Sequence, residues 1–333
     1  MTMERPIVTF FVPCYNVTGC VEKCFKSILD AGLGEKVEIL AVNDGSKDNT
    51  LELLRKYESE YPNIIRVIDK PNGGWGTAVN KGIAEAKGVY FKELDADDWV
   101  DTENLPQYVS ELEKLDCDYV ATNFSNFMDQ TKTIVPRTFQ KEIYGQVLEL
   151  NDFWDKYPDG WHFPIHAITY KTDFIRRIGL KVGDRYYSDF EYFMYSMPYV
   201  GKICVLDINV TMYFRGSDEQ STGVKGYAKN YRDFVAMTER LIAFYKQIPE
   251  KTHSGIKNSI RNTLLGNVGF AYELMMSPVY AGKKEGVKEE LKAFDQRIKN
   301  EGREFYGESG NRKKKGIKYI KIWRATGINL LKL

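Results

Sequence analysis

The sequence has few cysteines and lacks long apolar runs. Five cysteines occur among 333 residues, and no two of them form a CxxC pair. This argues against a disulfide framework and against a cysteine-type zinc site. The apolar run near the start ends at Pro13, which is too short for the core of a signal peptide, and no later run approaches the roughly 18 residues of a membrane span. We therefore expect a reduced, cytoplasmic chain.

The sequence also has almost no net charge. The 47 Lys and Arg residues face 46 Asp and Glu residues, for a net charge of +1. That balance argues against a general nucleic-acid-binding protein. The distribution is nevertheless uneven, because eight cations and no acid lie between Gly310 and Leu333, which leaves −7 for residues 1–309.

The first 125 residues alternate between two kinds of segment. Short runs of β-branched and aromatic residues predict strands at 7–12, 37–42, 64–68, 89–94 and 118–123. Segments with helical periodicity separate them at 21–31, 50–61, 77–86 and 104–115. This alternation predicts an α/β fold with a parallel sheet covered on both faces. Its strand-to-helix loops would meet at the carboxyl edge, where ligands of such folds bind.

The remaining residues fall into two regions. Residues 126–224 are irregular and rich in aromatic residues, with strand-like pieces at 204–209 and 211–214. From residue 225 the pattern is helical, at 227–245, 255–276 and 286–299. We therefore divide the chain into residues 1–125, 126–224 and 225–333.

Three carboxylates follow the fourth predicted strand within four residues: Asp95, Asp97 and Asp98. Like charges this close repel one another unless a cation lies between them. Mg²⁺ or Mn²⁺ fits such a loop, because these ions bind one or two carboxylates together with substrate phosphates. The alternative is a solvated turn in which Asp97 or Asp98 caps the next helix.

Two other loops at the same edge carry candidate nucleotide contacts. Asp44 can accept a hydrogen bond from a ring N–H of a base, and Tyr15 offers a face for stacking or else covers the sheet edge. Gly73, Gly74 and Gly76 would allow a ligand to approach N–H groups at a helix start. The pattern is neither GxGxxG nor a Walker motif, which disfavours a dinucleotide-binding domain and P-loop chemistry.

The segments VTFFVPCYN, AVNDGSKDNT and NGGWGTAVNKGIAEAKGVYFKELDADDWV, in this order, resemble the N-terminal half of family 2 glycosyltransferases with the GT-A fold. The resemblance covers residues 7–115. It implies a Rossmann-like nucleotide-sugar-binding half at 1–125 and an acceptor-binding half of the same GT-A domain at 126–224. The helical C-terminal extension, 225–333, does not resemble the family.

The resemblance implies inverting, metal-dependent transfer of a sugar from a nucleoside diphosphate sugar to an acceptor hydroxyl. Pro13, Tyr15 and Asp44 would hold the base and ribose, and uridine is the expected nucleoside, although Asp44 suits thymine equally. Asp95 would lie towards the ribose and Asp97 on Mn²⁺ or Mg²⁺. The role of Asp98 stays open.

The family also places a carboxylate base downstream, usually in a Glu-Asp pair. Here Asp189 follows Ser188 instead of Glu, so the pattern departs from the family's. Asp189 is the expected base and Glu191 the reserve, since an attacking hydroxyl must lose its proton. A helix cap is the alternative role for Asp189, and both roles are compatible.

Further candidates lie between residues 161 and 215. Arg215 resembles a family arginine that would bind the diphosphate or an acidic acceptor. Trp161, His166 and Glu191 are candidate acceptor contacts, and His166 is equally suited to a structural role or to serve as an extra metal ligand. Pro164 lies between His162 and His166, which argues against a helical zinc pair.

The basic segment 312–333 predicts an amphipathic helix with Ile320 and Trp323 on one side and cations such as Arg324 on the other. It would lie on an anionic membrane surface or dock on the protein's own helices. Membrane attachment would suit a lipid-linked precursor of a cell-surface glycan as acceptor, with the enzyme peripheral at the cytoplasmic face.

Two other functions remain as alternatives. A sugar nucleotidyltransferase would require a cationic, Gly-rich loop after the first strand, and VPCYN has no cation. A degenerate transferase that binds glycan or nucleotide without turnover is disfavoured by the acidic loop and Asp189, although Ser188 keeps it open.

Overall fold

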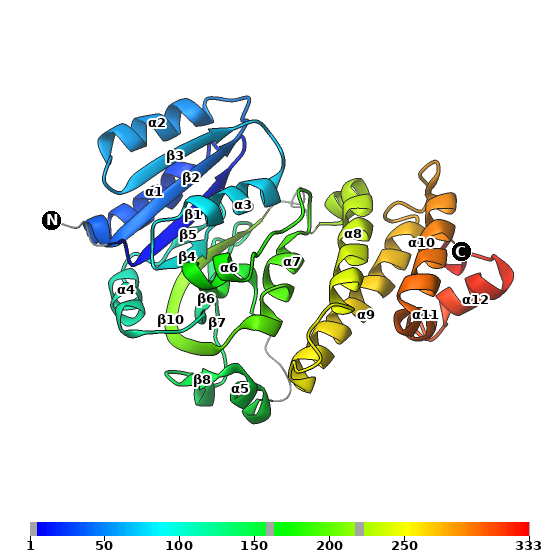
Figure 1. Cartoon of the computed structure of the whole chain (residues 1–333). Coiled ribbons are helices and arrows are strands. Elements are labelled where there is room, and N and C mark those ends of the chain that lie inside the picture. Colours follow the sequence, from blue (N-terminus) through cyan, green and yellow to red (C-terminus); the bar gives the residue numbers. More distant parts are fainter. Residues whose placement is uncertain (1–4, 158–162, 217–222, 333) are drawn as a thin grey trace. The chain divides into compact units, whose positions relative to one another are not determined.

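A computed structural model describes residues 5–157, 163–216 and 223–332. The chain divides into two compact units, residues 1–216 and 217–333, each described here by itself (Figure 1). The first unit contains a ten-stranded mixed sheet. The described part of the second unit is mainly helical. The predicted subdivision at residue 125 lies inside the first unit, whose sheet takes strands from both sides of that point.

The alternating pattern of the first 125 residues is confirmed. Its strands are β1 (Val8–Cys14), β2 (Val37–Asp44), β3 (Ile65–Lys70), β4 (Tyr90–Glu93) and β6 (Tyr119–Met128). Its helices are α1 (Val21–Leu29), α2 (Thr50–Glu60), α3 (Trp75–Glu85) and α4 (Leu105–Lys114). The strand order β3-β2-β1-β4 with parallel pairing places the carboxyl ends of all four strands at one edge.

The sheet is less uniformly parallel than the sequence predicts. A short strand, β9 (Ile168–Lys171), lies antiparallel between β4 and β6. The two pieces expected after residue 203 form one strand, β10 (Lys202–Arg215), whose register against β6 shifts around Asn209. Three further strands are β5 (Trp99–Val100), β7 (Thr133–Arg137) and β8 (Val147–Glu149). Strands of two to five residues have too little periodicity to be recognised without their partners.

Helices cover both faces of the parallel strands. On one face, α1, α2 and α4 bury the side chains of alternate β1 residues, including Val8, Phe10 and Val12. Helix α1 fits this face because its buried residues recur at helical spacing: Val21, Cys24, Phe25 and Ile28. On the other face α3 packs closely, with Gly82 against the ring of Phe11.

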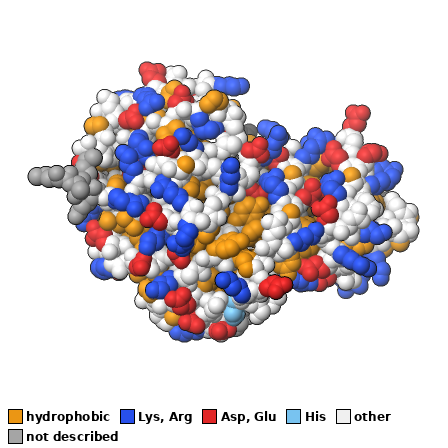
Figure 2. Space-filling model, in the orientation of Figure 1, with side chains coloured by type: hydrophobic (Ala, Val, Ile, Leu, Met, Phe, Trp, Pro, Cys, Tyr) orange, Lys and Arg blue, Asp and Glu red, His pale blue; other side chains and the backbone are white. Residues whose placement is uncertain are grey.

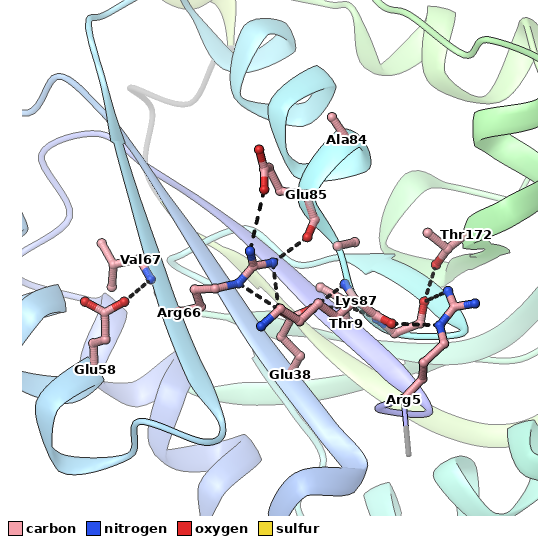
Figure 3. Close-up of polar contacts among 12 residues, drawn as sticks. Arg5, Thr9, Glu38, Glu58, Arg66, Val67, Ala84, Glu85, Lys87 and Thr172 are labelled. Carbon is pink, nitrogen blue, oxygen red and sulfur yellow. Dashed lines mark hydrogen bonds and ion pairs between the residues drawn. The ribbon is translucent and has the colours of Figure 1, made fainter. Parts of the chain in front are cut away.

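A buried polar network ties the strands together at the edge opposite the carboxyl ends (Figure 3). Glu38, near the start of β2, accepts hydrogen bonds from Thr9 Oγ1 at 2.5 Å, Arg66 Nε at 3.1 Å and the Lys87 amide at 2.8 Å. Thr9 Oγ1 in turn accepts a hydrogen bond from the Gly88 amide. The bonds compensate the cost of burying a charged carboxylate, which is 4% exposed.

Three short helices complete the first unit: α5 (Leu150–Lys156), α6 (Thr172–Arg177) and α7 (Asp189–Met194). The helix expected to start after Asp189 is α7, which includes Asp189 as its first residue. Ser188 occupies the N-cap position, but its side chain forms no capping hydrogen bond and its hydroxyl donates to the Arg185 carbonyl instead.

The helical pattern after residue 225 is also confirmed. The second unit contains α8 (Val224–Tyr245), α9 (Ser254–Met276), α10 (Val287–Glu301), α11 (Arg303–Ser309) and α12 (Tyr319–Thr326). Within residues 5–157, 163–216 and 223–332, no helix has both the length and the apolar character needed to cross a bilayer. Basic and acidic side chains are intermixed over the face shown in Figure 2, in keeping with the small net charge.

The basic C-terminal segment packs on the helices of its own unit. Ile320 is completely buried, and Arg324 donates to Asp295 Oδ1 at 2.6 Å while its guanidinium lies 3.6 Å from the Tyr306 ring centroid. A partly buried carboxylate and an aromatic ring therefore hold Arg324 against its own unit. Exposed cations remain in this segment at Lys313, Lys315 and Lys321.

Candidate active site

The acidic loop lies at the carboxyl edge of the sheet, as predicted, directly after β4. Asp98 is buried and accepts a hydrogen bond from the Phe214 amide of β10 at 2.7 Å. Asp95 is partly buried, and the side chain of Trp75 in α3 is near enough to oppose the rise of its pKa. Asp97 remains exposed. The loop therefore joins β4, α3 and β10, with one carboxylate left open to solvent.

Burial and mutual repulsion set the charge state of this loop. Desolvation raises the pKa of Asp95, and the neighbouring charge of Asp97 raises it further. The pKa of Asp98 is also raised well above its usual value, first by burial and then by Asp95. Carboxylates that raise one another's pKa values in this way favour a cation between them.

Asp189 comes close to the acidic loop although it lies far away in the sequence. Its negative charge contributes to the raised pKa of Asp95. Burial at the start of α7 raises the pKa of Asp189 itself to about 6, although backbone N–H groups at Phe190 and Asp189 partly oppose the increase. A carboxylate with this pKa is still largely ionised at neutral pH and is more basic than an ordinary aspartate, as a general base requires.

The segment before α7 is held against the start of α3. Asn80 of α3 exchanges two hydrogen bonds with the backbone of Val182, of 2.9 and 3.0 Å. A Cβ atom added at Gly76 would lie 1.6 Å from the carbonyl oxygen of Gly183, and one at Gly74 would lie 1.9 Å from that of Asp184. The glycines of the NGGWG segment thus allow two parts of the chain to pack closely.

Glu191 supports the same segment. It is completely buried, and its carboxylate accepts a hydrogen bond from the Gly183 amide. This contact links α7 to the loop that precedes it. The Glu191 side chain is enclosed by protein, and its expected roles as acceptor contact and reserve base stay predictions.

Asp44 accepts hydrogen bonds from protein donors on both carboxylate oxygens. The Gly73 and Gly74 amides donate at 2.9 and 2.8 Å, and Lys70 Nζ forms an ion pair with Oδ1. The N–H groups of the glycine segment are therefore engaged by Asp44 in this structure. The base-binding role of Asp44 stays a prediction, and a nucleotide ring N–H would have to share or replace one of these donors.

The other two predicted nucleotide contacts lie at the end of β1. Pro13 is half-buried within the strand, while Tyr15 follows it and is 45% exposed. Asn16 then adopts a left-handed conformation, with φ of 54°, and its amide donates to Ser46 Oγ in the loop after β2. The open face of Tyr15 is therefore placed at the carboxyl edge, beside the loop that carries Asp44.

Tyr213, which lies near the acidic loop, contacts both His166 and Arg215. The Tyr213 ring stacks on His166 with 4.4 Å between centroids, and the Arg215 guanidinium lies 5.4 Å from the Tyr213 ring. The pKa of Tyr213 is raised to about 12, mainly by burial and further by the negative charges of Asp98 and Asp95. The influence of these two charges shows that the Tyr213 ring lies beside the acidic loop.

His166 is 9% exposed and lies in the short 3-10 turn η3 (Ile165–Ala167). Burial lowers its pKa to about 3, so the ring is neutral at physiological pH. Its T-shaped contact with Phe124, at 4.3 Å, makes it a packing residue, and the expected acceptor contact remains untested. The other aromatic candidate, Trp161, lies outside the described residues, as does His162.

Sequence reasoning missed Lys92 and Glu93, which precede the acidic loop in β4. Both are buried, at 0% and 1% exposed. Lys92 Nζ donates to the His166 carbonyl at 2.7 Å, and burial lowers its pKa to about 8. Burial raises the pKa of Glu93 well above its usual value, and the neighbouring Asp95 raises it further. Two adjacent charged residues inside an otherwise apolar strand were the available signal.

The described residues contain no cluster of three His, Cys, Asp or Glu side chains that could hold a metal ion by themselves. The exposed Asp97 next to two partly or fully buried carboxylates instead matches the manner in which Mg²⁺ and Mn²⁺ bind, with few protein oxygens and the rest supplied by phosphates and water. The donor set therefore fits such an ion bound together with a diphosphate.

Comparison with known sequences identifies the family. The family model described as Glycosyl transferase family 2 matches residues 9–177. The chain is 36% identical over 131 residues to the uncharacterized glycosyltransferase EpsJ of Bacillus subtilis (strain 168), covering 39% of this chain and 38% of EpsJ. It is 35% identical over 109 residues to a chondroitin synthase of Pasteurella multocida, covering 33% of this chain and 11% of the synthase. The chain thus spans well under half the length of either relative.

Solved structures show the same fold over most of the chain. TarS residues 1–349 from S. aureus, solved in complex with UDP-GlcNAc, matches with a TM-score of 0.57 at 13% identity, covering 96% of this chain and 92% of that one. A mannosyltransferase from Pyrobaculum calidifontis, solved with GDP-Man and Mn²⁺, matches with a TM-score of 0.51 at 14% identity, covering 92% and 85%. The expected GT-A architecture with C-terminal helices is therefore confirmed. The family model spans about half of the sequence, from β1 through α6, and the chain therefore belongs to glycosyl transferase family 2.

Proposed function

We propose that this protein is an inverting glycosyltransferase that moves a sugar from a nucleoside diphosphate sugar to an acceptor hydroxyl, with Asp189 as the base. The observation that carries the proposal is the approach of Asp189 to Asp95, two carboxylates from distant parts of the chain. Family membership supports the reaction class, and the structural neighbours solved with UDP-GlcNAc and GDP-Man support a nucleotide sugar as donor.

The residues divide the chemistry between them. Tyr15 and Asp44 would bind the base at the ends of β1 and β2, with Pro13 beneath them, and Asp95 would lie towards the ribose. Asp189 would take the proton of the acceptor hydroxyl as its oxygen bonds to the anomeric carbon and the bond to the diphosphate breaks. A single base with no placed nucleophile predicts inversion of the anomeric configuration.

Asp97 is the side chain that would hold Mn²⁺ or Mg²⁺. When bound, such an ion offsets the negative charge that develops on the leaving diphosphate. Arg215 lies beside Tyr213 at the same edge and would contact the diphosphate or an acidic acceptor. We propose UDP as the nucleotide because TarS was solved with UDP and with UDP-GlcNAc.

We further propose that the acceptor is a cell-surface glycan or its lipid-linked precursor, reached from the cytoplasmic face of the membrane. The relatives that carry the name of a polysaccharide synthase support the glycan. Exposed Lys313, Lys315 and Lys321 support contact with an anionic surface, since each such cation contributes up to ~1 kcal/mol.

The test combines binding with turnover. Thermal stability measured with UDP, GDP and TDP, with and without Mn²⁺, should rise most for one metal–nucleotide pair. The matching nucleotide sugar should then be hydrolysed or transferred, and Asp189→Ala should reduce turnover by about 10²–10⁴-fold. Nucleotide affinity should change little in the same variant.

Three outcomes would contradict parts of this assignment. Normal turnover by a folded Asp189→Ala protein would remove Asp189 as the base. Metal-dependent binding that survives Asp97→Ala would remove Asp97 from the metal site. Nucleotide binding by the natural protein without turnover of any nucleotide sugar would favour a non-catalytic binding module.

A further inference from the structure

Two lysines from distant parts of the chain converge on the same aromatic ring. Lys23 lies in the first turn of α1, and its Nζ lies 2.8 Å from the centroid of the Trp99 ring and 5.2 Å from that of Phe127. Lys132 lies in the turn between β6 and β7, and its Nζ is 5.9 Å from the same Phe127 centroid. The two ammonium groups therefore lie around one ring.

The rings beneath these lysines form an aromatic patch of Trp99, Phe127 and Phe214. Phe127 of β6 pairs with Phe214 of β10, and their rings stack with 6.2 Å between centroids. Trp99 meets Phe127 edge-on at 5.2 Å, and all three residues are partly exposed. Because neighbouring residues of a strand point to opposite faces, the patch lies on the face of the sheet opposite to Tyr213.

The patch nevertheless borders the candidate active site. Trp99 follows Asp97 by two residues. Cys20 directly precedes α1, and its pKa is raised first by burial and then by the negative charge of Asp97. The start of α1, and with it Lys23 one turn later, therefore lies close to the acidic loop.

The positive charge of Lys23 has no counter-ion. Among the described residues no carboxylate forms an ion pair or hydrogen bond with it, whereas Lys132 pairs with Asp129. Burial lowers the pKa of Lys23, and the charge of Lys132 lowers it further. The rings supply cation–π contact but no negative charge. A partly buried cation beside a like charge is stabilised when an anion binds between the two.

We infer that Lys23 and Lys132 bind an anionic group, a phosphate or a carboxylate, on the acceptor glycan. The donor diphosphate is expected on the other face, with Asp97 and Arg215, so the anion at the patch belongs to the second substrate. The exposed Asp97 repels a negatively charged acceptor, and the two cations offset that repulsion. Assigning the anion to the acceptor rests on the proposed function, whereas anion binding at the patch does not.

The first test is calorimetry of the full-length protein with three oligosaccharide probes. Oligogalacturonate supplies carboxylates, an oligomer of glycerol phosphate supplies phosphates, and maltohexaose is the neutral reference. At least one anionic probe should bind more tightly than maltohexaose, and the preferred one identifies the anion. Lys23→Gln and Lys132→Gln should each weaken that binding by about tenfold or more.

Lys26→Gln is the matched control, because Lys26 is an exposed lysine of the same helix with the same charge. It should change the affinity by less than about twofold. Lys23→Arg keeps both the charge and the ring contact and should stay within about threefold of the natural protein. Equal binding of all three probes by the natural protein, or equal affinities of Lys23→Gln and Lys26→Gln, would overturn the inference.

The second test separates the anion site from the proposed function. In a transfer assay with the preferred anionic probe as acceptor, Lys23→Gln should raise KM for the acceptor by about tenfold and leave KM for the nucleotide sugar within about twofold. A rise in KM for the nucleotide sugar instead would overturn the assignment to the acceptor. If the natural protein binds the anionic probe but turns over no nucleotide sugar, the proposed function fails and the anion site stands.

Discussion

Asp189 illustrates how a single residue acquires its chemistry from its surroundings. The sequence offers an aspartate after a serine, in a pattern that departs from the family's. Burial at the start of α7 raises its pKa to about 6. The acceptor hydroxyl can lose its proton only to the ionised form, so activity depends on how far this carboxyl group is deprotonated.

We therefore expect kcat/KM for transfer to rise with pH up to a point near 6 and to level off above it. Below that point the rate should fall about tenfold per pH unit, because only the ionised base is active. Nucleotide affinity measured over the same range separates this effect from protonation of Asp95, whose pKa is also raised. A rate that is constant between pH 5 and 7 would contradict the assignment.

Glu38 shows the opposite use of a buried carboxylate, for stability alone. Three donors hold it at the edge of the sheet away from the site (Figure 3). Glu38→Ala leaves Arg66 and the Lys87 amide with a lost partner and should lower the free energy of unfolding by about 3–5 kcal/mol. Glu38→Gln should cost less, about 1–2 kcal/mol, because the amide keeps part of the network. Chemical denaturation of the two variants measures both values.

At the scale of elements, the contact between α3 and the segment before α7 connects the donor half of the site to the base. Gly76 lies in α3, and any side chain there would collide with the Gly183 carbonyl. Gly76→Ala should therefore displace the segment that leads to Asp189. We expect a loss of about 1–3 kcal/mol in stability and at least about tenfold in kcat/KM, with a smaller change in UDP affinity.

Gly266→Ala is the matched control for that variant. Gly266 is also a helical glycine, in α9, but it is exposed and a Cβ atom there would have no neighbour within 4 Å. This change should be neutral or stabilise the protein by up to about 1 kcal/mol, since alanine favours a helix over glycine. Equal effects of the two substitutions on activity would rule out the α3 contact as the cause.

At the scale of the whole molecule, positive charge is concentrated near the C-terminus. The C-terminal segment carries eight cations, but Arg324 is paired with Asp295, and Arg312 and Lys314 lie against Glu273. Deleting the segment would therefore remove part of the packing of the second unit together with its charge. Substitution of its exposed cations is the cleaner test of membrane contact.

Glu substituted at Lys313, Lys315 and Lys321 should lower binding to vesicles that contain anionic lipid by about tenfold or more, with unchanged thermal stability. The same substitution at three exposed lysines of α10 serves as the control for net charge: Lys288, Lys292 and Lys299. Equal losses in both proteins would indicate a nonspecific charge effect. Unchanged vesicle binding in the first would return the whole segment to a structural role.

The sequence was most informative where structure is local. Five strands and four helices of the first 125 residues, and three long helices after residue 224, follow from hydrophobic periodicity and are present as expected. The acidic loop was placed correctly at the carboxyl edge, because the parallel order of neighbouring strands fixes that edge. The family, too, could be inferred from the order of short motifs.

Only the tertiary structure decided how distant residues share one environment. Periodicity does not reveal the antiparallel insertion of β9, the burial of Glu191 and Glu93, or the ion pair between Arg324 and Asp295. It also cannot show that the NGGWG glycines pack against residues 183–184. Strand and helix propensities depend on neighbours along the chain, whereas burial, pairing and pKa depend on contacts between segments that the sequence keeps far apart.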